Sequence, residues 1–433
     1  MNAQWQRKNL SSCPKILDHY TLSSLPTSIP PDVKAFTFFE RSKDPEVGGI
    51  GNGWISRLKT AGFAPSVATW DFVLFAFAVC AADLAVIRKN SADGWTRQIE
   101  LKVTLNNPKA WRREAVRLEQ MLKTLTGDYW KLRFTDGGPP PPVGKRVLCD
   151  RDCVALLSGG LDSLIGGIDA KAQGRNPIFV SQLAYDDSPR QRKYAAALGG
   201  EMWHQQWSHK INFEGSHEPS TRGRSMAFYG LAVLSASLLT AKRPEIIVPE
   251  NGFISVNPPL LPGRMASLST RTTHPLFMQQ LQDALPLLGV DVALTMPYQF
   301  KTKGEMLAEC ADQKTLARYA SDSTSCGRFR TNNSTHCGRC VPCMVRKAAF
   351  LRWGKITDKT VYSFDSVVNA GKSSADDPMA VAVAVLTARN GGVDKLLGAT
   401  LSFASPSDRS KYRRMLETGL TELDTLLMRD GLL

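Results

Sequence analysis

The chain of 433 residues has little of what would place it in a membrane. Its most apolar stretch, WDFVLFAFAVCAADLAVI, is interrupted by Asp71 and Asp83, and the uncharged run between them is too short to span a bilayer. The first residues, MNAQWQRKNLSSC, lack an apolar core of signal-peptide length. We therefore expect a cytoplasmic protein with no membrane partner, in which the apolar stretch forms a buried helix.

Internal repeats are absent and histidines are few, and the spacing of the histidines is not that of a metal site. Cysteines are more informative, because four of the nine gather within eighteen residues in the pattern Cys-x10-Cys-x2-Cys-x2-Cys. In a cytosolic chain such a cluster indicates a bound metal more often than disulfides. The clustered residues are Cys326, Cys337, Cys340 and Cys343, and the other five are predicted to be ordinary buried thiols.

Four thiolates satisfy tetrahedral Zn²⁺ and leave no open position for water, so the cluster predicts a structural zinc site. Gly338 lies between the second and third cysteines, where the chain must turn tightly. Nearby arginines and Lys347 can offset the charge of four thiolates. A redox or iron–sulfur role is the alternative, and His336 is expected to be a bystander.

The balance of charge is strongly basic, with a net charge of +14 and a pI of about 9.4. Such a surface favours a polyanionic partner, which can be a nucleotide, a nucleic acid or an acidic protein. Ordinary solubilising charge explains the same numbers. Charge alone therefore does not choose among these partners.

Changes of pattern along the chain predict four regions. Residues 1–136 resemble an α+β accessory or docking module, with strands at RQIELKVTL and DYWKLRF on either side of an amphipathic helix. Four consecutive prolines make residues 137–146 a stiff linker. Residues 147–355 alternate apolar strands with helices, which is typical of a parallel α/β sheet. Residues 356–433 form a mainly helical C-terminal extension that ends in a long amphipathic helix.

The segment CVALLSGGLDSLIGGI predicts a strand that enters a helix through a glycine-rich turn. Gly159 and Gly160 let the backbone approach an anion closely, and the amides at the helix start favour negative charge. The turn lacks the Gly-Lys-Ser/Thr ending of the common nucleotide-triphosphate loop. Asp162 would repel phosphate, so we interpret it as a magnesium ligand or a positioning group. A plain helix start with packing glycines is the alternative.

Ser-Gly-Gly-Leu-Asp-Ser at this place resembles the PP-loop of the N-type ATP pyrophosphatases. In that superfamily the turn holds the β- and γ-phosphates as a leaving group while a substrate atom attacks the α-phosphorus. The resemblance implies that Asp162 and Ser163 are catalytic and that Mg²⁺ accompanies ATP. The ATP-binding residues that it implies are Leu157, Ser158, Gly159, Gly160, Leu161, Asp162 and Ser163.

The PP-loop followed by the cysteine cluster resembles the QueC family of 7-cyano-7-deazaguanine synthases. That resemblance implies a Rossmann-like sheet of the adenine nucleotide alpha hydrolase type, adenylation of a 7-deazaguanine carboxylate by ATP, and transfer of the acyl group to an amine. The segment TKGEM is similar to the Thr-Lys-Ala-Glu helix start of the family, so Lys303 is expected to contact phosphate or the acyl-adenylate.

The N-terminal region and the tail make the whole chain similar to QueC-like components of bacterial anti-phage systems, the QatC family above all. This resemblance implies protein partners from a defence operon and an acceptor amine that is either ammonia or an amine on a partner protein. A nucleic-acid partner is less favoured.

The substrate pocket of the QueC family is only partly recognisable in this chain. Tyr185 carries over from one family segment, and Arg222 or Arg224 from another. Other candidates come from the residues themselves: strand ends of parallel sheets hold ligands, and an arginine can bind a carboxylate or phosphate through two bonds. These further candidates are Glu250, Asn251, Arg271 and His274.

Three functions remain open at this point. The first is a ligase that forms AMP and pyrophosphate from ATP and a deazaguanine acid. The second is an RNA-modifying PP-loop enzyme of the tRNA thiolation or lysidine type, which the basic charge would suit. The third is a non-catalytic component that binds ATP to stabilise a defence complex.

Overall fold

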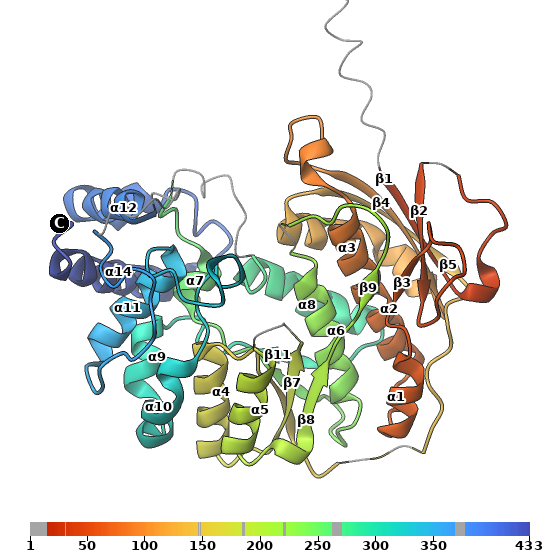
Figure 1. Ribbon diagram of the computed structural model, residues 1–433, viewed down its shortest axis with the longest axis horizontal. Helices are drawn as coiled ribbons and strands as arrows, with labels where there is room; N and C mark the ends of the chain where they lie inside the picture. Colours follow the sequence, from red (N-terminus) through yellow and green to blue (C-terminus); the bar gives the residue numbers. More distant parts are fainter. Residues whose placement is uncertain are drawn as a thin grey trace, which may run out of the picture. The chain divides into compact units, whose positions relative to one another are not determined.

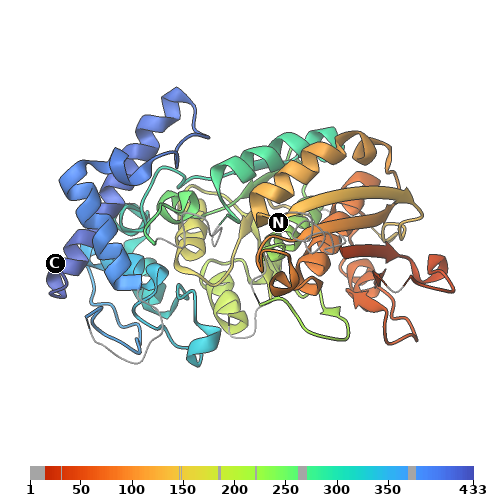
Figure 2. The same ribbon diagram turned by 90° about the horizontal axis from the view of Figure 1, so that it is seen from above.

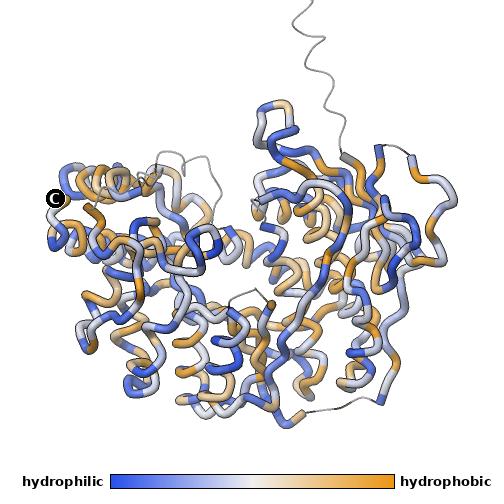
Figure 3. Tube along the Cα trace, viewed as in Figure 1, coloured by the Kyte–Doolittle hydropathy of each residue, from blue (hydrophilic) through white to orange (hydrophobic). Residues whose placement is uncertain are grey.

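The computed structural model describes residues 15–30, 32–145, 147, 149–183, 187–219, 222–261, 271–368 and 377–433. The chain forms two compact units. Unit 1 extends to Asp150 and adds Trp207–Glu245 and Gln279–Ala293, and unit 2 contains Arg151–Gln206, Ile246–Met278 and Leu294–Leu433. Apolar residues are distributed through both units, so each has a core of its own (Figure 3).

Unit 1 contains a six-stranded sheet in the order β5-β4-β1-β2-β3-β9. Every pair of neighbouring strands in this sheet is parallel except β3 and β9, which are antiparallel. The predicted α+β module is therefore built on a largely parallel sheet, because helix α3 (Lys109–Thr126) is the crossover between β4 and β5. The strands are β1 (Lys15–Tyr20), β2 (Val33–Phe38), β3 (Gly48–Ile50), β4 (Gln98–Leu105), β5 (Tyr129–Asp136) and β9 (Ile211–Asn212).

The helices of unit 1 are α1 (Trp54–Thr60), α2 (Val67–Ala85), α3 (Lys109–Thr126) and α6 (Arg224–Ala236). Their positions confirm the strands and the amphipathic helix predicted between residues 97 and 136. Helix α6 was expected to belong with the parallel sheet of residues 147–355. It packs closely on α2 instead, since a methyl group at Gly230 would lie 2.9 Å from Cβ of Ala76. This contact explains why Trp207–Glu245 belongs to unit 1.

Helix α2 is the predicted apolar helix. Among the described residues it alone is long and apolar enough to cross a membrane, but 78% of its most apolar window is buried inside the protein. It contacts α6 and β4. The helix is thus a core helix of unit 1. This confirms the prediction of a buried helix that was made from its two aspartates.

A network of buried ion pairs stabilises unit 1. Arg97 donates hydrogen bonds to both Asp83 and Asp128, and Arg88 donates to both carboxylate oxygens of Asp128, at 2.7 and 2.9 Å. All four side chains are almost completely buried. Removing one member of such a network leaves a partner charged and unpaired, so each of them contributes to stability.

Unit 2 is built on a five-stranded sheet in the order β11-β10-β6-β7-β8. The central strands β6 and β7 are parallel and fully buried, as the apolar runs predicted. The chain is therefore an α/β protein with sheets rich in parallel strands. The strands are β6 (Cys153–Leu156), β7 (Pro177–Gln182), β8 (His204–Trp207), β10 (Glu245–Ile247) and β11 (Ala293–Thr295).

Helices of unit 2 include the predicted C-terminal helix, α14, which packs against α11 and α12 in one apolar core (Figure 1). Seen from above, these helices at the blue end of the chain lie against one another (Figure 2). The predicted extension, 356–433, is therefore an integral part of unit 2. The helices are α4 (Leu161–Ala172), α5 (Ser188–Ala197), α7 (Gly252–Val256), α9 (Lys303–Glu309), α10 (Gln313–Tyr319), α11 (Val341–Trp353), α12 (Asp377–Gly391), α13 (Val393–Leu397) and α14 (Pro406–Arg429), while α8 (Pro275–Leu287) begins in a segment of unit 2 and ends in a segment of unit 1.

Candidate functional site

The predicted phosphate turn joins the carboxyl end of β6 to the first residue of α4. Gly159 has φ of +90°, a conformation that other residues rarely adopt. Gly160 caps the helix from an extended conformation, and no side chain caps this end. Helix α4 begins at Leu161, and the backbone amides of its first turn have no carbonyl acceptor within the helix. The backbone is therefore arranged as an anion-binding turn would require.

Hydrogen bonds within the turn fix its shape. The Ser158 hydroxyl accepts from the Gly160 amide at 3.3 Å and donates to the Ser163 hydroxyl at 3.2 Å. The Ser163 hydroxyl in turn donates to the Gly160 carbonyl at 2.9 Å. The hydroxyls of the two serines thus hold the glycine turn in shape. Because they are used in this way, a phosphate would be bound chiefly by backbone amides.

Two neighbours of the turn were not singled out from the sequence. The Thr324 amide donates to the Gly159 carbonyl at 3.2 Å, and Thr324 pairs with Gly160 in a parallel bridge. The Gln191 amide group donates to the carbonyls of Ser158 and Gln182, at 3.1 Å each. Thr324 could have been noticed because it stands two residues before Cys326, whereas nothing in the local sequence marks Gln191.

Asp162 lies buried in the first turn of α4 and is held from two other segments. One of its oxygens is paired with the Lys303 ammonium, at the start of α9. The other accepts the Asn251 side-chain amide at 2.6 Å and the Asn251 backbone amide at 3.2 Å. Burial alone would raise the pKa of the Asp162 carboxyl, but the Lys303 charge and these hydrogen bonds outweigh it and lower the pKa.

Glu250 completes this group, which we call the Asp162 cluster: Asp162, Glu250, Asn251 and Lys303. Burial raises the pKa of the Glu250 carboxyl well above its ordinary value, and the neighbouring charge of Asp162 raises it further. The Glu250 side chain lies close to that of Asp162. A glycine makes this approach possible, since a methyl group at Gly166 in α4 would lie 2.2 Å from Cβ of Pro249.

The geometry of the Asp162 cluster bears on the two roles foreseen for Asp162. Both carboxylate oxygens are already engaged, one by Lys303 and one by Asn251. The residues present therefore do not fit a magnesium ion bound directly by Asp162, and they fit a positioning group.

The substrate-binding candidates from the resemblance fall in a different part of the chain. Arg222 is buried in unit 1, where its backbone amide donates to Asp83 and its guanidinium donates to the Thr126 carbonyl. Arg224 is the first residue of α6 and is exposed. The contacts of Arg222 are those of a structural residue in the buried charge network. Tyr185 lies outside the described residues.

Arg271 and His274 lie in the segment just before α8, which begins at Pro275, in a part of the chain that belongs to unit 2. The His274 ring packs edge-on against Phe403, with 4.8 Å between ring centroids. Burial and the charge of Arg271 lower the pKa of His274 to about 4, so the ring is neutral at physiological pH. Burial also lowers the pKa of Arg271. Neither residue is among the contacts of the Asp162 cluster that the structure describes.

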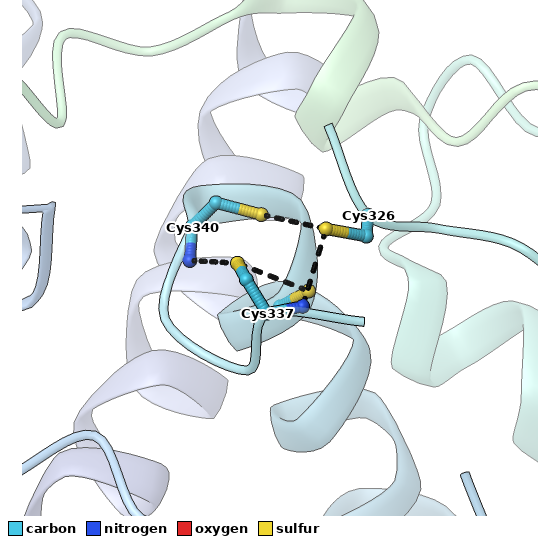
Figure 4. A group of neighbouring side chains, drawn as sticks. Cys326, Cys337 and Cys340 are labelled. Atoms are coloured by element: carbon cyan, nitrogen blue, oxygen red, sulfur yellow. Dashed lines mark hydrogen bonds between the residues drawn. The ribbon is translucent and has the colours of Figure 1, made fainter. Parts of the chain in front are cut away.

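The four predicted cysteines come together at the start of α11 (Figure 4). Their sulfurs all lie within 4.8 Å of one another, with 3.8 Å between Cys326 and Cys340 and 4.0 Å between Cys337 and Cys343. Four sulfurs bonded to one zinc ion at about 2.3 Å lie about 3.8 Å apart. The cluster therefore fits a structural zinc ion. His336 is not a member, because its Nε2 accepts the Ser325 amide at 3.1 Å.

The turn through the cysteine cluster depends on Gly338. Its φ is +83°, and a methyl group there would lie 2.0 Å from the Phe364 carbonyl. Lys347 donates to that carbonyl at 2.8 Å. Arg346 is fully buried and donates to the Ser323 hydroxyl at 2.8 Å and the Ser325 hydroxyl at 3.1 Å. These serines flank Thr324, so the cysteine segment and the phosphate turn are joined.

Comparison of the chain with models of known protein families, with curated proteins and with solved structures found no match. A function for the site can therefore be inferred only from its residues, their geometry and the resemblance of its motifs to those of known families.

Proposed function

We propose that the protein is an ATP-dependent ligase of the PP-loop type, with the adenine nucleotide alpha hydrolase-like fold in unit 2. It activates the carboxylate of a 7-deazaguanine acid and transfers the acyl group to an amine. The observation that carries the proposal is the Ser-Gly-Gly-Leu-Asp-Ser turn between β6 and α4, whose Asp162 is held by Lys303 and Asn251. Such a buried carboxyl cluster beside an anion-binding turn is typical of a functional site.

The proposed reaction has two steps. A carboxylate oxygen of the acid attacks the α-phosphorus of ATP, the bond from that phosphorus to the bridging oxygen breaks, and pyrophosphate leaves with the electron pair. The amine nitrogen then attacks the acyl carbon and displaces AMP, and the amine loses a proton. Charge grows on the departing pyrophosphate in the first step, so donors placed there stabilise the transition state.

The chain supplies these donors from the phosphate turn. Backbone amides at Gly159 and in the first turn of α4 would hold the β- and γ-phosphates. A loop that retains pyrophosphate does not need the lysine of the common triphosphate loop, which serves transfer of the terminal phosphoryl group. Asp162 positions the Lys303 ammonium, and Lys303 adds positive charge beside the leaving group.

The substrate class and the setting come from the QueC-like resemblance. It supports a deazaguanine carboxylic acid as substrate, ammonia or an amine of a partner protein as acceptor, and a cytoplasmic role in bacterial anti-phage defence. The zinc ion would hold the cysteine segment in shape and, through Thr324, help to fix the phosphate turn. It would take no part in the reaction because four sulfurs complete its coordination.

Pyrophosphate release by the purified protein tests the proposal. ATP, 7-carboxy-7-deazaguanine and ammonium should together yield pyrophosphate and AMP in equal amounts, and Ser163→Ala, which loses the brace at Gly160, should reduce this strongly. Release that requires tRNA and ignores the deazaguanine acid would favour the RNA-modifying alternative. Tight ATP binding without release, in the presence of partner proteins and acid, would favour the non-catalytic alternative.

A further inference from the structure

Helix α14 of the C-terminal segment reaches two of the three helix starts that surround Asp162. At α7, the approach is so close that a methyl group on Gly419 would lie 2.2 Å from the Phe253 ring. Phe253 follows Asn251, the N-cap residue of α7 that donates to Asp162, by two residues. Helix α14 thus packs directly against the segment that holds Asn251.

The contact of α14 with α9 is polar and runs through Glu422. The Glu422 carboxylate is buried, accepts the Thr302 hydroxyl at 2.5 Å and accepts Arg352 of α11 at 2.9 Å. Thr302 is the N-cap of α9, immediately before Lys303, and forms a capping box with Glu305. Glu422 therefore fixes the hydroxyl on which the start of α9 depends.

The fit between α14 and α9 is tight. A methyl group on Gly304 would lie 2.5 Å from an oxygen of Glu422 and 2.7 Å from Cδ of Arg352. Arg414 of α14 adds a second hold, because it pairs with Glu305 and donates to the Phe300 carbonyl. The first turn of α9 is thus fixed from both sides of Lys303 by side chains more than a hundred residues away.

We infer that Glu422 is a positioning residue for Lys303, which it places against Asp162 by holding the N-cap of α9. The inference deepens the proposed function and depends on it for the consequence in catalysis. The C-terminal segment, predicted from the sequence as an extension, then helps to support the proposed catalytic site. Glu422 itself touches neither Asp162 nor the phosphate turn among the contacts that the structure describes.

A set of variants tests this inference. Glu422→Ala removes the acceptor for Thr302, so kcat for pyrophosphate release should fall between about tenfold and about a hundredfold, with a smaller change in KM for ATP. Glu422→Gln keeps an acceptor oxygen and should lose less activity. Glu417→Gln, on the exposed face of the same helix, is the matched control and should leave activity unchanged.

Gly304 provides a double-mutant cycle. Gly304→Ala should reduce kcat in the wild-type background, because the added methyl meets Glu422 and Arg352, and should have a smaller further effect in Glu422→Ala, where only the contact with Arg352 remains. Equal effects of Gly304→Ala in both backgrounds would overturn the direct contact.

Amide hydrogen exchange gives a readout that does not require activity. In Glu422→Ala the amides at the start of α9, residues 302–306, should exchange at least about tenfold faster than in wild type, whereas Glu417→Gln should not change them. Unchanged exchange there in Glu422→Ala would overturn the inference whatever the activity. Faster exchange in Glu422→Ala, together with a wild-type protein that releases no pyrophosphate, would instead contradict the proposed function and leave the positioning role standing.

Discussion

Each unit buries a cluster of charged side chains, and the two clusters differ in balance. In unit 1 three buried arginines lie among three buried carboxylates: Arg88, Arg97 and Arg222 with Asp83, Asp128 and Glu218. In the Asp162 cluster of unit 2, two carboxyls share one ammonium, that of Lys303. One network is matched charge for charge, and the other is not.

The protonation of the two clusters follows from this difference. Burial opposes ionisation of Asp128, but hydrogen bonds and charge from Arg97 outweigh it, and the pKa of Asp128 lies below its ordinary value. For Glu250 burial and the Asp162 charge act together, and its pKa is raised. A matched network serves stability, whereas a cluster that is short of positive charge can change its protonation as a ligand arrives.

The largest effect is expected from the structural cysteine cluster that supports unit 2. Cys340→Ser should lose its zinc and leave unit 2 unfolded, because structural zinc contributes on the order of 10 kcal/mol. Zinc content by mass spectrometry and unfolding by circular dichroism measure this. Cys310→Ser, at a buried cysteine outside the cluster, is the control and should keep its zinc. A folded, zinc-loaded Cys340→Ser protein would refute the four-cysteine assignment.

Next in size is the matched network of unit 1. Arg97→Met leaves Asp83 and Asp128 short of a partner and should lower the free energy of unfolding by about 3–5 kcal/mol. Urea titration measures this. Arg133→Met removes an arginine that pairs with Glu100 at the surface, and should cost no more than about 1 kcal/mol. Equal costs for the two variants would contradict the role assigned to the buried network.

Variants of the Asp162 cluster should differ from those of the unit 1 network, with a large effect on activity and a small effect on the free energy of unfolding. Lys303→Met should reduce pyrophosphate release by about a hundredfold or more. Its cost in unfolding free energy should stay below about 2 kcal/mol, because Asp162 keeps its hydrogen bonds from Asn251 and can take up a proton. Lys301→Met, at a more exposed lysine paired with Glu309, is the matched control. An active Lys303→Met enzyme would remove Lys303 from the mechanism.

The smallest effect is a difference in pH dependence between the clusters. Glu250 keeps its proton above the ordinary value of 4.5, where the unfolded chain has lost it, so this residue lowers stability as pH rises. The stability of Glu250→Gln relative to wild type should therefore increase as pH rises above 4.5. The ionised form of Asp128 stabilises the fold above 3.8 and loses this effect as pH falls.

Asp128→Asn should accordingly cost stability at pH 7, with a cost that shrinks toward pH 3. Thermal unfolding of both variants and the wild type across this pH range supplies the measurement. Parallel pH trends for the two variants would show that the clusters do not differ as described.

Local patterns in the sequence predicted several features correctly. The turn between β6 and α4, the buried helix α2, the amphipathic helix α14 and the meeting of four cysteines are all visible in neighbouring residues. Each depends on spacing or periodicity within a short segment, which is why sequence alone sufficed.

Long-range contacts could not be predicted in this way. Asp162, Asn251 and Lys303 were each singled out, but their hydrogen bonds to one another join three distant segments. Arg222 was placed near a substrate because its local motif resembles a family segment, and its burial beside Asp83 became visible only in three dimensions. The same holds for Glu422, whose partner Thr302 lies 120 residues earlier.

Exchange of labelled pyrophosphate into ATP tests the central claim most directly, because it reports adenylation without any acceptor amine. The account predicts that the wild-type protein incorporates label only when 7-carboxy-7-deazaguanine is present. It predicts little incorporation by Ser163→Ala or Lys303→Met and normal incorporation by Lys301→Met. Exchange that is absent from the wild type with the acid, or equally strong in Ser163→Ala and Lys303→Met, would contradict it.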